Sequence, residues 1–381
     1  MTAAGHVEFV GMIGTQHVSE IHPASGPPVD PDFVRRFVTA HEVAGFDKVL
    51  VGHSASTADG LQVAAFGAAH SERLGFLVAH RPGFMAPTLA ARAFATLDRF
   101  SGGRAALHTI SGGSDADQRR DGDRLDKEGR YRRTDEYLEV LTRTWTAEEP
   151  FDHHGEFYDV EDVHATVRPV QQPRIPVYFG GSSPAAYRVG GRHADVFALW
   201  GEPLAETAEQ IAAVREAARA AGRDTPPRIS VSFRPILGAT EEKAWERAHD
   251  VLDRITAAGG GGGSFTGRTT HRRGHEAPSN AGSQRLLAAA ERGELHDRAL
   301  WTPTASATGA AGNSTALVGT PETVAAALLD YVDIGVSTLL LRGYDPLDDV
   351  AAYGRELLPL VHAEVARRTT DRPHRLEEPA S

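Results

Sequence analysis

Cysteine and long apolar runs are both missing from this sequence. With no cysteine among its 381 residues, the chain has neither a disulfide framework nor a thiolate nucleophile. No segment approaches the roughly 18 consecutive apolar residues of a membrane span. The N-terminus also lacks a basic stretch followed by an apolar core and a small-residue cleavage site. These absences predict a soluble, cytoplasmic protein with no membrane partner.

Positive charge is also in short supply. The formal net charge is -11, which argues against a broad basic surface for nucleic acid. The hydrophobic fraction of 41% and the charged fraction of 24% are those of an ordinary globular protein. Local arginine clusters remain, so an anionic small molecule is still an acceptable ligand.

Short β-branched or apolar runs alternate along the chain with longer helical patterns. Such alternation is typical of a parallel sheet covered by helices. Eight runs are present, and eight strands close a barrel, whereas open sheets usually have about five to seven. We therefore predict a (β/α)8 TIM barrel over residues 1–367 as a single domain, followed by a disordered tail at 368–381. The predicted strands are 7–13, 46–51, 74–79, 104–110, 175–180, 194–199, 229–237 and 336–343.

Residues 86–103 illustrate the helical pattern. Leu89, Ala93, Leu97 and Phe100 recur at helical spacing and predict one apolar face, and Gly102-Gly103 provides a stop.

Three segments interrupt the alternation and are predicted as insertions at the carboxyl-terminal face of the barrel. Residues 111–130 are polar, and residues 150–173 are typical of a hairpin followed by a proline-bounded return. Residues 257–282 are glycine-rich and basic, which predicts a mobile lid, because helical patterns continue on both sides.

Chemistry-bearing residues gather just after the predicted strands. In a parallel barrel, ligands collect at the carboxyl ends of the strands, so these positions are the candidates for a site. Several of the 18 histidines fall there. The residues at these ends include His17, His53, His80, His108, Ser182, Ser183, Trp200, Glu202, Arg234, Arg342 and Tyr344.

Two segments are suited to hold a phosphate. Gly181, Ser182 and Ser183 lie between a strand and a helix start, where glycine allows close approach and free N–H groups attract anions. The alternative is a tight turn with an ordinary serine cap. Residues 127–133 place cations and Tyr131 at another helix start, which the helix dipole disfavours unless an anion lies nearby. For Arg132 and Arg133 we favour a solvated surface, with Asp135 and Glu136 as partners.

Other common site motifs are missing. No HExxH or HxH spacing supports a metal site, so metal catalysis is not expected. A GxSxG elbow, a Walker loop and a GxGxxG after a strand are missing as well.

Four segments, at 76–114, 125–145, 167–203 and 313–350, closely resemble those of alkanesulfonate monooxygenases, in the same order. The resemblance covers roughly residues 7–365 and identifies the chain as similar to the bacterial luciferase-like flavin-dependent monooxygenases. It implies a two-component enzyme that receives reduced FMN from a separate NAD(P)H:FMN reductase and uses O2 to oxygenate a small organic substrate. In the sulfonate members, C–S cleavage gives an aldehyde and sulfite. The resemblance also implies a homodimer or homotetramer, and a lid at 257–282 that would exclude water.

The resemblance implies specific flavin-contact positions. The FMN phosphate would lie against Lys127, Tyr131, Gly181, Ser182 and Ser183, which agrees with the two segments described above. The edge of the flavin ring would be hydrogen-bonded by His80, His108 and also His17, or these histidines would tune proton delivery. The flavin-contact residues are His80, His108, Lys127, Tyr131, Gly181, Ser182 and Ser183.

The substrate side departs from the sulfonate pattern. Ser232 and Arg234 stand where the Arg-x-His pair is expected, and Ala310 stands near the place of another arginine. The family's Tyr-Pro-His is here Tyr344-Asp345-Pro346, and its site cysteine is replaced within residues 53–59. Sulfonate specificity is therefore open.

We expect four residues on the catalytic and substrate side: His17, Arg234, Arg342 and Tyr344, with Tyr344 as a proton donor. A structural alternative is that Arg342 pairs with Asp345 or Glu202. Alternative functions are a monooxygenase of a sulfone, an amine or a natural-product intermediate, and a deazaflavin-dependent dehydrogenase. A non-enzymatic flavin-binding relative would show a shortened barrel or a lost lid, and the sequence indicates neither.

Overall fold

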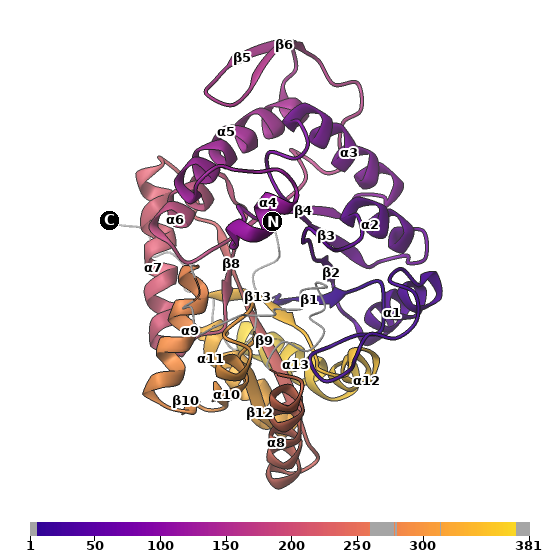
Figure 1. The fold of residues 1–381 in the computed structure, drawn as a ribbon, viewed down its shortest axis with the longest axis vertical. Coiled ribbons are helices and arrows are strands. Elements are labelled where there is room, and N and C mark those ends of the chain that lie inside the picture. Colours follow the sequence, from indigo (N-terminus) through magenta and orange to yellow (C-terminus); the bar gives the residue numbers. More distant parts are fainter. Residues whose placement is uncertain (1–5, 260–277, 279, 313, 371–381) are drawn as a thin grey trace, which may run out of the picture.

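Eight parallel strands form a closed barrel (Figure 1) in the computed structural model, which describes residues 6–259, 278, 280–312 and 314–370. β13 pairs with β1 on one side and β9 on the other, and β8 pairs with β9, so the ring is complete. The predicted barrel is confirmed, and each predicted strand range overlaps one barrel strand. These strands are β1 Glu8–Ile13, β2 Lys48–Val51, β3 Gly75–His80, β4 Ala105–Thr109, β7 Val177–Gly180, β8 Val196–Trp200, β9 Arg228–Leu237 and β13 Val336–Leu341.

Helices that follow the strands surround the barrel in Figure 1. In α1, Asp30 accepts hydrogen bonds from the backbone N–H groups of Asp32 and Phe33, and Gly45 ends the helix at φ 86°. Its buried face includes Phe33 and Phe37 and packs on the strands. The covering helices are α1 Pro31–Ala44, α2 Gly60–Ala68, α3 Pro87–Phe100, α5 Lys127–Thr146, α6 Pro184–His193, α7 Leu204–Ala220, α11 Pro321–Asp333 and α13 Leu358–Thr370.

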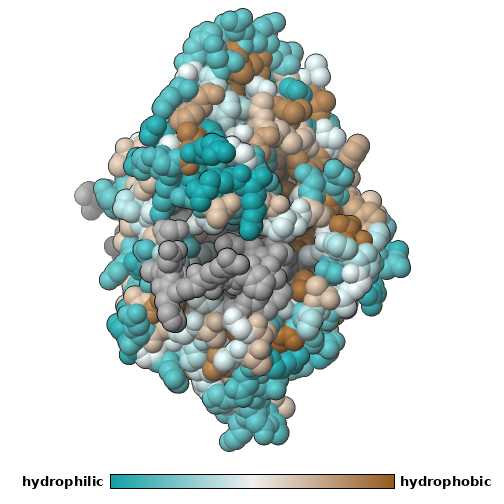
Figure 2. Space-filling model, in the orientation of Figure 1, coloured by the Kyte–Doolittle hydropathy of each residue, from teal (hydrophilic) through white to brown (hydrophobic). Residues whose placement is uncertain are grey.

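The predicted buried face of α3 is wrong. Leu97 is buried, but Leu89 is 48% exposed and Phe100 is 79% exposed. The helix instead buries a neighbouring stripe that includes Ala90, Ala91 and Phe94, because two alanines let it approach the barrel closely. Hydrophobic residues gather over α3 in the surface view (Figure 2).

The barrel interior is packed, and its amino-terminal end is polar. Val10, Leu77, Ala106, Tyr178 and Val196 form a buried cluster inside the ring of strands. Below it, Glu8 accepts hydrogen bonds from the Tyr178 hydroxyl at 2.7 Å and the Thr338 hydroxyl at 3.0 Å, and pairs with Lys48. Burial alone would raise the pKa of Glu8, but Lys48 and the hydrogen bond from Tyr178 lower it, so the carboxylate stays charged.

Insertions lengthen the connections around the barrel. The hairpin predicted within 150–173 is confirmed as antiparallel β5 Phe151–His154 and β6 Asp159–Val163, and the polar 111–130 segment contains α4 Asp115–Arg120. β9 continues past the barrel, where Arg234–Leu237 pair with β12. β10 and β11 are too short, at 2 residues each, to leave a periodic signal, so the sequence does not predict them. The remaining elements are α8 Glu241–Ala257, α9 Ala281–Arg292, β10 Leu295–His296, β11 Leu300–Trp301, α10 Pro303–Ala307, β12 Ala316–Gly319, α12 Pro346–Ala352 and a π-helix at Tyr353–Leu357.

Two predicted segments fall partly outside the described residues. Most of the proposed lid at 257–282, namely residues 260–277 and 279, lies outside them, so its mobility stays a prediction. The tail is predicted from residue 368, whereas α13 continues to Thr370, and residues 371–381 lie outside the described part. Among the described residues, no helix combines the length and apolar character needed to cross a bilayer.

Candidate active site at the barrel mouth

The mouth is the end of the barrel at which the strands finish. Successive side chains of a strand alternate faces, so residues two positions beyond the interior cluster also point inward. On β3, β4, β7 and β8 these residues are Ala79, His108, Gly180 and Ala198, and the register pairs Ala79 with His108 and Gly180 with Ala198. Because three of the four are alanine or glycine, this side of the mouth has little side-chain volume above the packed interior. Such a floor is suited to a flat ring.

His108 is the polar group of this floor. Its Nδ1 is buried and has no hydrogen-bond partner among the described residues. A Cβ placed on Gly180 would lie 3.4 Å from its Cε1, so the imidazole lies beside the bare backbone of β7. Burial lowers the pKa of His108 to about 4, which keeps the ring neutral near pH 7. A buried imidazole nitrogen without a partner in the protein is suited to hydrogen-bond a ligand.

His80 points away from His108, into the helix layer. Its Nε2 lies 2.6 Å from the Tyr137 hydroxyl on α5, and its ring packs edge-on against Phe94 on α3, with centroids 5.5 Å apart. Burial lowers its pKa to about 4. The structure therefore separates the two histidines that the sequence analysis grouped as flavin contacts.

Tyr131, Gly181 and Ser183 come together beside the start of α6, and we call them with Ser182 the α6 corner. The Ser183 hydroxyl accepts from the Ala186 N–H at 3.2 Å and donates to the Tyr131 hydroxyl at 3.3 Å. A Cβ on Gly181 would lie 3.5 Å from the Tyr131 hydroxyl and only 2.7 Å from the Ala186 Cβ. Glycine thus keeps the corner open to the N-terminus of α6, which attracts anions.

The cations near this corner differ in their surroundings. Lys127 is exposed at the first position of α5, and the described residues give it no contact with the corner. Arg132 pairs with Glu156 at 3.0 Å, and Arg133 pairs with Asp123 at 2.5 Å. These partners differ from the Asp135 and Glu136 expected from the sequence, but the arginines do form pairs within the protein.

Three charged side chains from separate elements meet on the opposite side of the mouth. Arg234 of β9 is buried and binds Glu20 of the β1–α1 loop through Nη1 at 3.3 Å and Nη2 at 2.9 Å. Its Nε and Nη2 also donate to the carbonyl oxygens of Arg342 and Gly343, both at 2.9 Å. The Arg342 guanidinium pairs with the same Glu20 carboxylate. Neither alternative sequence-based partner of Arg342 is correct, because Asp345 pairs with His22 and Arg247, and Glu202 with Arg285.

The three charged groups of this triad shift one another's pKa values. Burial would raise the pKa of Glu20, but Arg234 and Arg342 lower it to about 2. Burial and the like charge of Arg234 together lower the pKa of Arg342 to about 10, even with Glu20 adjacent. Glu20 therefore stays ionised between the two guanidinium groups.

Tyr344 lies under the triad and is almost fully buried, at 1% exposure. The Arg234 guanidinium carbon lies 3.8 Å from the centre of its ring. Burial raises the pKa of Tyr344, so its hydroxyl stays protonated. The geometry gives Tyr344 a supporting position beneath Arg234.

His17 lies on the β1–α1 loop, three residues before Glu20. Its ring packs edge-on against Phe33 and against His22, with centroids 5.8 and 5.1 Å apart. His22, in turn, is hydrogen-bonded to Asp345, which follows β13.

Three mouth residues, Glu20, His22 and Asp345, were not predicted as site residues, and His53 was placed at a strand end but given no role. Glu20 and His22 lie in a loop without periodicity, and their partners are more than 200 residues away in sequence, so no local signal identifies them. His53 follows β2, and its buried Nε2 has no partner among the described residues. Burial and Arg81 lower the pKa of His53. The clustering of histidines at strand ends was the one available signal for it.

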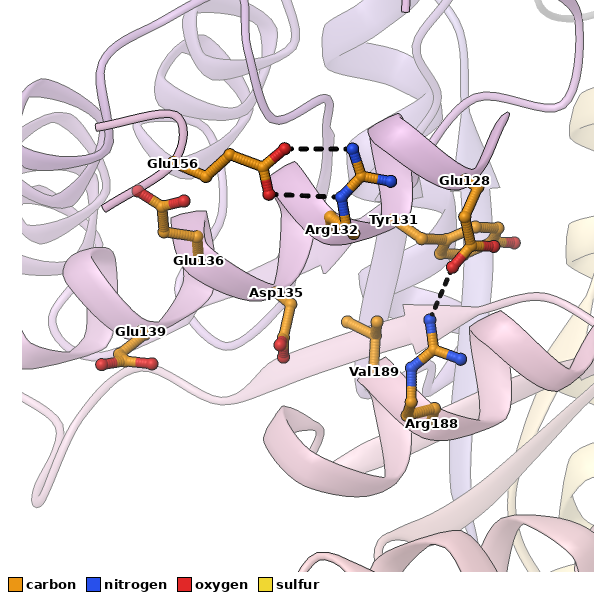
Figure 3. Close-up of a pocket in the computed structure, with 9 residues that line it drawn as sticks. All are labelled: Glu128, Tyr131, Arg132, Asp135, Glu136, Glu139, Glu156, Arg188 and Val189. Carbon is orange, nitrogen blue, oxygen red and sulfur yellow. Dashed lines mark hydrogen bonds and ion pairs between the residues drawn. The ribbon is translucent and has the colours of Figure 1, made fainter. Parts of the chain in front are cut away.

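A cavity of about 380 Å³ lies on the outer side of the α6 corner, between α5 and α6 (Figure 3). Its walls include Glu128, Asp135 and Glu139 of α5, with Arg188 of α6 pairing with Glu128 at 2.9 Å. Tyr131 contributes to this cavity and also to the α6 corner. The mostly acidic walls are unsuited to a phosphate, which favours the α6 corner instead. Among the described residues, no group of three or more histidine, cysteine or acidic side chains is placed to hold a metal ion.

Comparison with known proteins agrees with this architecture. A family model described as luciferase-like monooxygenase matches residues 8–338. Riboflavin lyase (RcaE), solved with modified FMN and riboflavin, is similar at 20% identity, covering 94% of this chain and 92% of that one with a TM-score of 0.78. EDTA monooxygenase (EmoA) from Chelativorans sp. BNC1 is 17% identical over 96% of this chain and 94% of its own, with a TM-score of 0.71. An F420-dependent secondary alcohol dehydrogenase is 15% identical over 93% and 99%, with a TM-score of 0.65. At these identities the solved structures show the shared fold alone.

Proposed function

The chain belongs to the luciferase-like monooxygenase family, and on that premise we propose that it is the oxygenating component of a two-component monooxygenase. It would receive reduced FMN from a separate NAD(P)H:FMN reductase and oxygenate a small organic substrate with O2. The predicted resemblance to this family is confirmed. The observation that carries the proposal is the unpaired, neutral His108 beside the small residues Ala79, Gly180 and Ala198.

The residues at the mouth fit FMN in two parts. The α6 corner would hold the phosphate, with hydroxyl donors from Tyr131, Ser182 and Ser183, and with Lys127 adding positive charge at the start of α5. The floor at Ala79, Gly180 and Ala198 would receive the ring, and His108 Nδ1 would hydrogen-bond its edge. When bound, reduced FMN supplies the electrons for the reduction of O2.

His80 supports the proposed site through another residue. Its hydrogen bond to Tyr137 fixes α5, the helix that also carries Tyr131. His80 would therefore orient the phosphate side without touching the cofactor. Tyr344 and Arg234 would similarly orient Arg342, because Arg234 already uses its donors on Glu20 and two carbonyl groups.

The substrate would carry a negative charge, which Arg342 would bind. Arg342 lies at the mouth beside Arg234 and Glu20, and its guanidinium is suited to bind an anionic group of a substrate through charge-assisted hydrogen bonds. An alkanesulfonate, converted to an aldehyde and sulfite, fits this requirement. A neutral sulfone, an amine or a natural-product intermediate is the alternative, because Ser232 and Arg234 replace the Arg-x-His pair of sulfonate enzymes.

A deazaflavin-dependent dehydrogenase is the second candidate function. The similarity in fold to an F420-dependent alcohol dehydrogenase gives this candidate its basis. The two functions differ in their use of oxygen, since hydride transfer from a deazaflavin does not consume O2.

One titration separates these functions. The protein is titrated anaerobically with reduced FMN and, separately, with reduced F420, and each complex is then mixed with O2 and octanesulfonate. We expect tight binding of reduced FMN, oxygen consumption and release of sulfite. Binding of F420 alone would overturn the monooxygenase proposal, whereas oxygen consumption without sulfite would overturn only the sulfonate substrate.

A further inference from the structure

A histidine–carboxylate pair lies at the mouth beside the proposed substrate side. His22 comes from the loop after β1, and Asp345 from the loop after β13, the neighbouring strand. The His22 Nε2 is hydrogen-bonded to Asp345 Oδ1. The two side chains are 27% and 30% exposed, so the pair is partly covered yet open to solvent.

Asp345 is held in place from other elements. Its Oδ2 accepts from Arg247 of α8 at 3.2 Å, and its backbone N–H donates to Asp349 of α12 at 2.9 Å. Burial would raise the pKa of Asp345, but His22 and Arg247 lower it. Asp345 is therefore a fixed, ionised carboxylate.

The ionised carboxylate determines the tautomer of His22. A carboxylate only accepts hydrogen bonds, so the proton of a neutral His22 ring must be on Nε2. Nδ1 is then the free acceptor, and among the described residues it has no hydrogen-bond partner. This is the arrangement in which a carboxylate orients an imidazole for proton transfer.

Charged groups from several elements surround the pair. Arg247 faces two carboxylates, those of Asp345 and Asp349. His17 contacts the His22 ring from the same loop, where Glu20 is already paired with Arg234 and Arg342, and Arg254 of α8 donates to the Ile21 carbonyl at 2.9 Å. Asp345 and Asp349 thus share one guanidinium group beside His22.

We propose that His22 is the proton donor for oxygen reduced at the barrel mouth, with Asp345 as its positioning residue. This inference rests on the proposed function, in which reduced FMN supplies two electrons to O2. The Nδ1–H bond of the imidazolium breaks, an O–H bond forms on the reduced oxygen, and the electron pair of the broken bond stays on Nδ1. The neutral ring then takes its next proton from solvent. Positioned general acids of this kind accelerate reactions by about 10²–10⁴-fold.

The experiment measures reoxidation of enzyme-bound reduced FMN by O2, with release of H2O2, between pH 5.5 and 9 and without substrate. For the wild type we expect a rate that falls with rising pH, as an imidazolium donor deprotonates. For His22→Gln we expect a rate at least about tenfold lower near pH 6.5 and independent of pH, with unchanged FMN affinity. His154→Gln is the matched control, because His154 pairs with Asp159 in the exposed hairpin, and it should match the wild type.

Nitrogen-15 NMR of the FMN-free protein gives a second readout that is independent of activity. The neutral His22 ring should carry its proton on Nε2 in the wild type, and Asp345→Asn should shift the population toward Nδ1–H. A wild-type ring protonated on Nδ1, or an unchanged pH profile in folded His22→Gln, would overturn the inference. If the wild type itself fails to bind reduced FMN, it is the proposed function that fails.

Discussion

Glu20 and Arg234 are joined by two charge-assisted hydrogen bonds, at 2.9 and 3.3 Å, although 214 positions separate them in the sequence. The two hydrogen bonds connect the β1–α1 loop to β9 across the mouth, and Arg342, which directly follows β13, pairs with the same carboxylate. The loop is thereby held over strands with which it has no backbone pairing. This contact makes the stability of the protein sensitive to a single surface-loop residue.

Replacing Glu20 with Gln should destabilise the protein by about 3–5 kcal/mol, because two buried arginines lose their shared carboxylate. Urea unfolding of the ligand-free protein measures this change. Glu128→Gln, which removes an exposed pair with Arg188, should change the free energy of unfolding by only about 0–1 kcal/mol. Equal effects of the two variants would contradict a buried ionic triad.

Stability should fall as the pH drops from about 6.5 toward 4. His41, His80 and His108 have folded pKa values of about 4, below the value of 6.5 for a free histidine. The unfolded chain therefore takes up protons in this window that the folded chain does not, which favours unfolding. In His108→Asn, the free energy of unfolding should fall less steeply with decreasing pH than in the wild type. Identical slopes for this variant and the wild type would refute the low pKa of His108.

A separate loss should follow at lower pH. Glu20 has a folded pKa of about 2 against a usual value of 4.5, so its contribution is complete above 4.5 and disappears as the pH falls through 2. The free energy of unfolding of Glu20→Gln should lack this component. Comparing the two proteins between pH 5 and 2 measures it, and a constant difference across that range would be the contrary result.

Tyr131→Phe should weaken binding of reduced FMN by about fivefold to tenfold, because one hydroxyl of the α6 corner is removed. Riboflavin lacks the phosphate and provides the matched ligand, so its affinity should not change. Anaerobic fluorescence titration gives both constants. A similar loss for the two ligands would mean that Tyr131 does not face the phosphate.

Arg342→Met should raise KM for an anionic substrate by about 10–100-fold, the range for a lost hydrogen bond to a charged group. The remaining Glu20–Arg234 pair is electrically balanced, so the variant should stay folded. A neutral dialkyl sulfone of the same chain length serves as the control ligand, and its binding should be unaffected. If the variant binds both the anionic substrate and the neutral sulfone more weakly by the same factor, Arg342 contributes to the shape of the mouth and not to recognition of negative charge.

The fold was accessible from the sequence because its signals are local. Each barrel strand is a short apolar run, and eight of them imply closure. The α3 prediction failed where periodicity alone could not rank two apolar stripes: Leu89 and Phe100 are larger, but Ala90, Ala91 and Phe94 are the buried set. The small alanine side chains let the helix pack closer to the barrel, and a periodicity pattern gives alanine less weight than larger apolar residues.

The candidate site could be predicted from the sequence only in part. Ser183 and Tyr131 could be identified because each lies at a helix start with a recognisable sequence. Glu20 and His22 could not, since their roles come from Arg234 and Asp345 across the mouth. The direction of His80 depends on strand register, where a shift of one residue exchanges the interior for the helix layer. The sequence therefore placed His80 at the end of its strand but did not give the direction of its side chain.

The hydrogen-bonded cluster of Glu8, Tyr178 and Thr338 has a kinetic consequence. Together with Val10, Leu77 and Val196 it fills the amino-terminal half of the barrel, so the interior is a blind end and not a channel. Reactants and products then share one opening. A molecule bound deepest must arrive first and depart last, which imposes an order of addition and makes product trapped above the floor an obstacle to the next turnover.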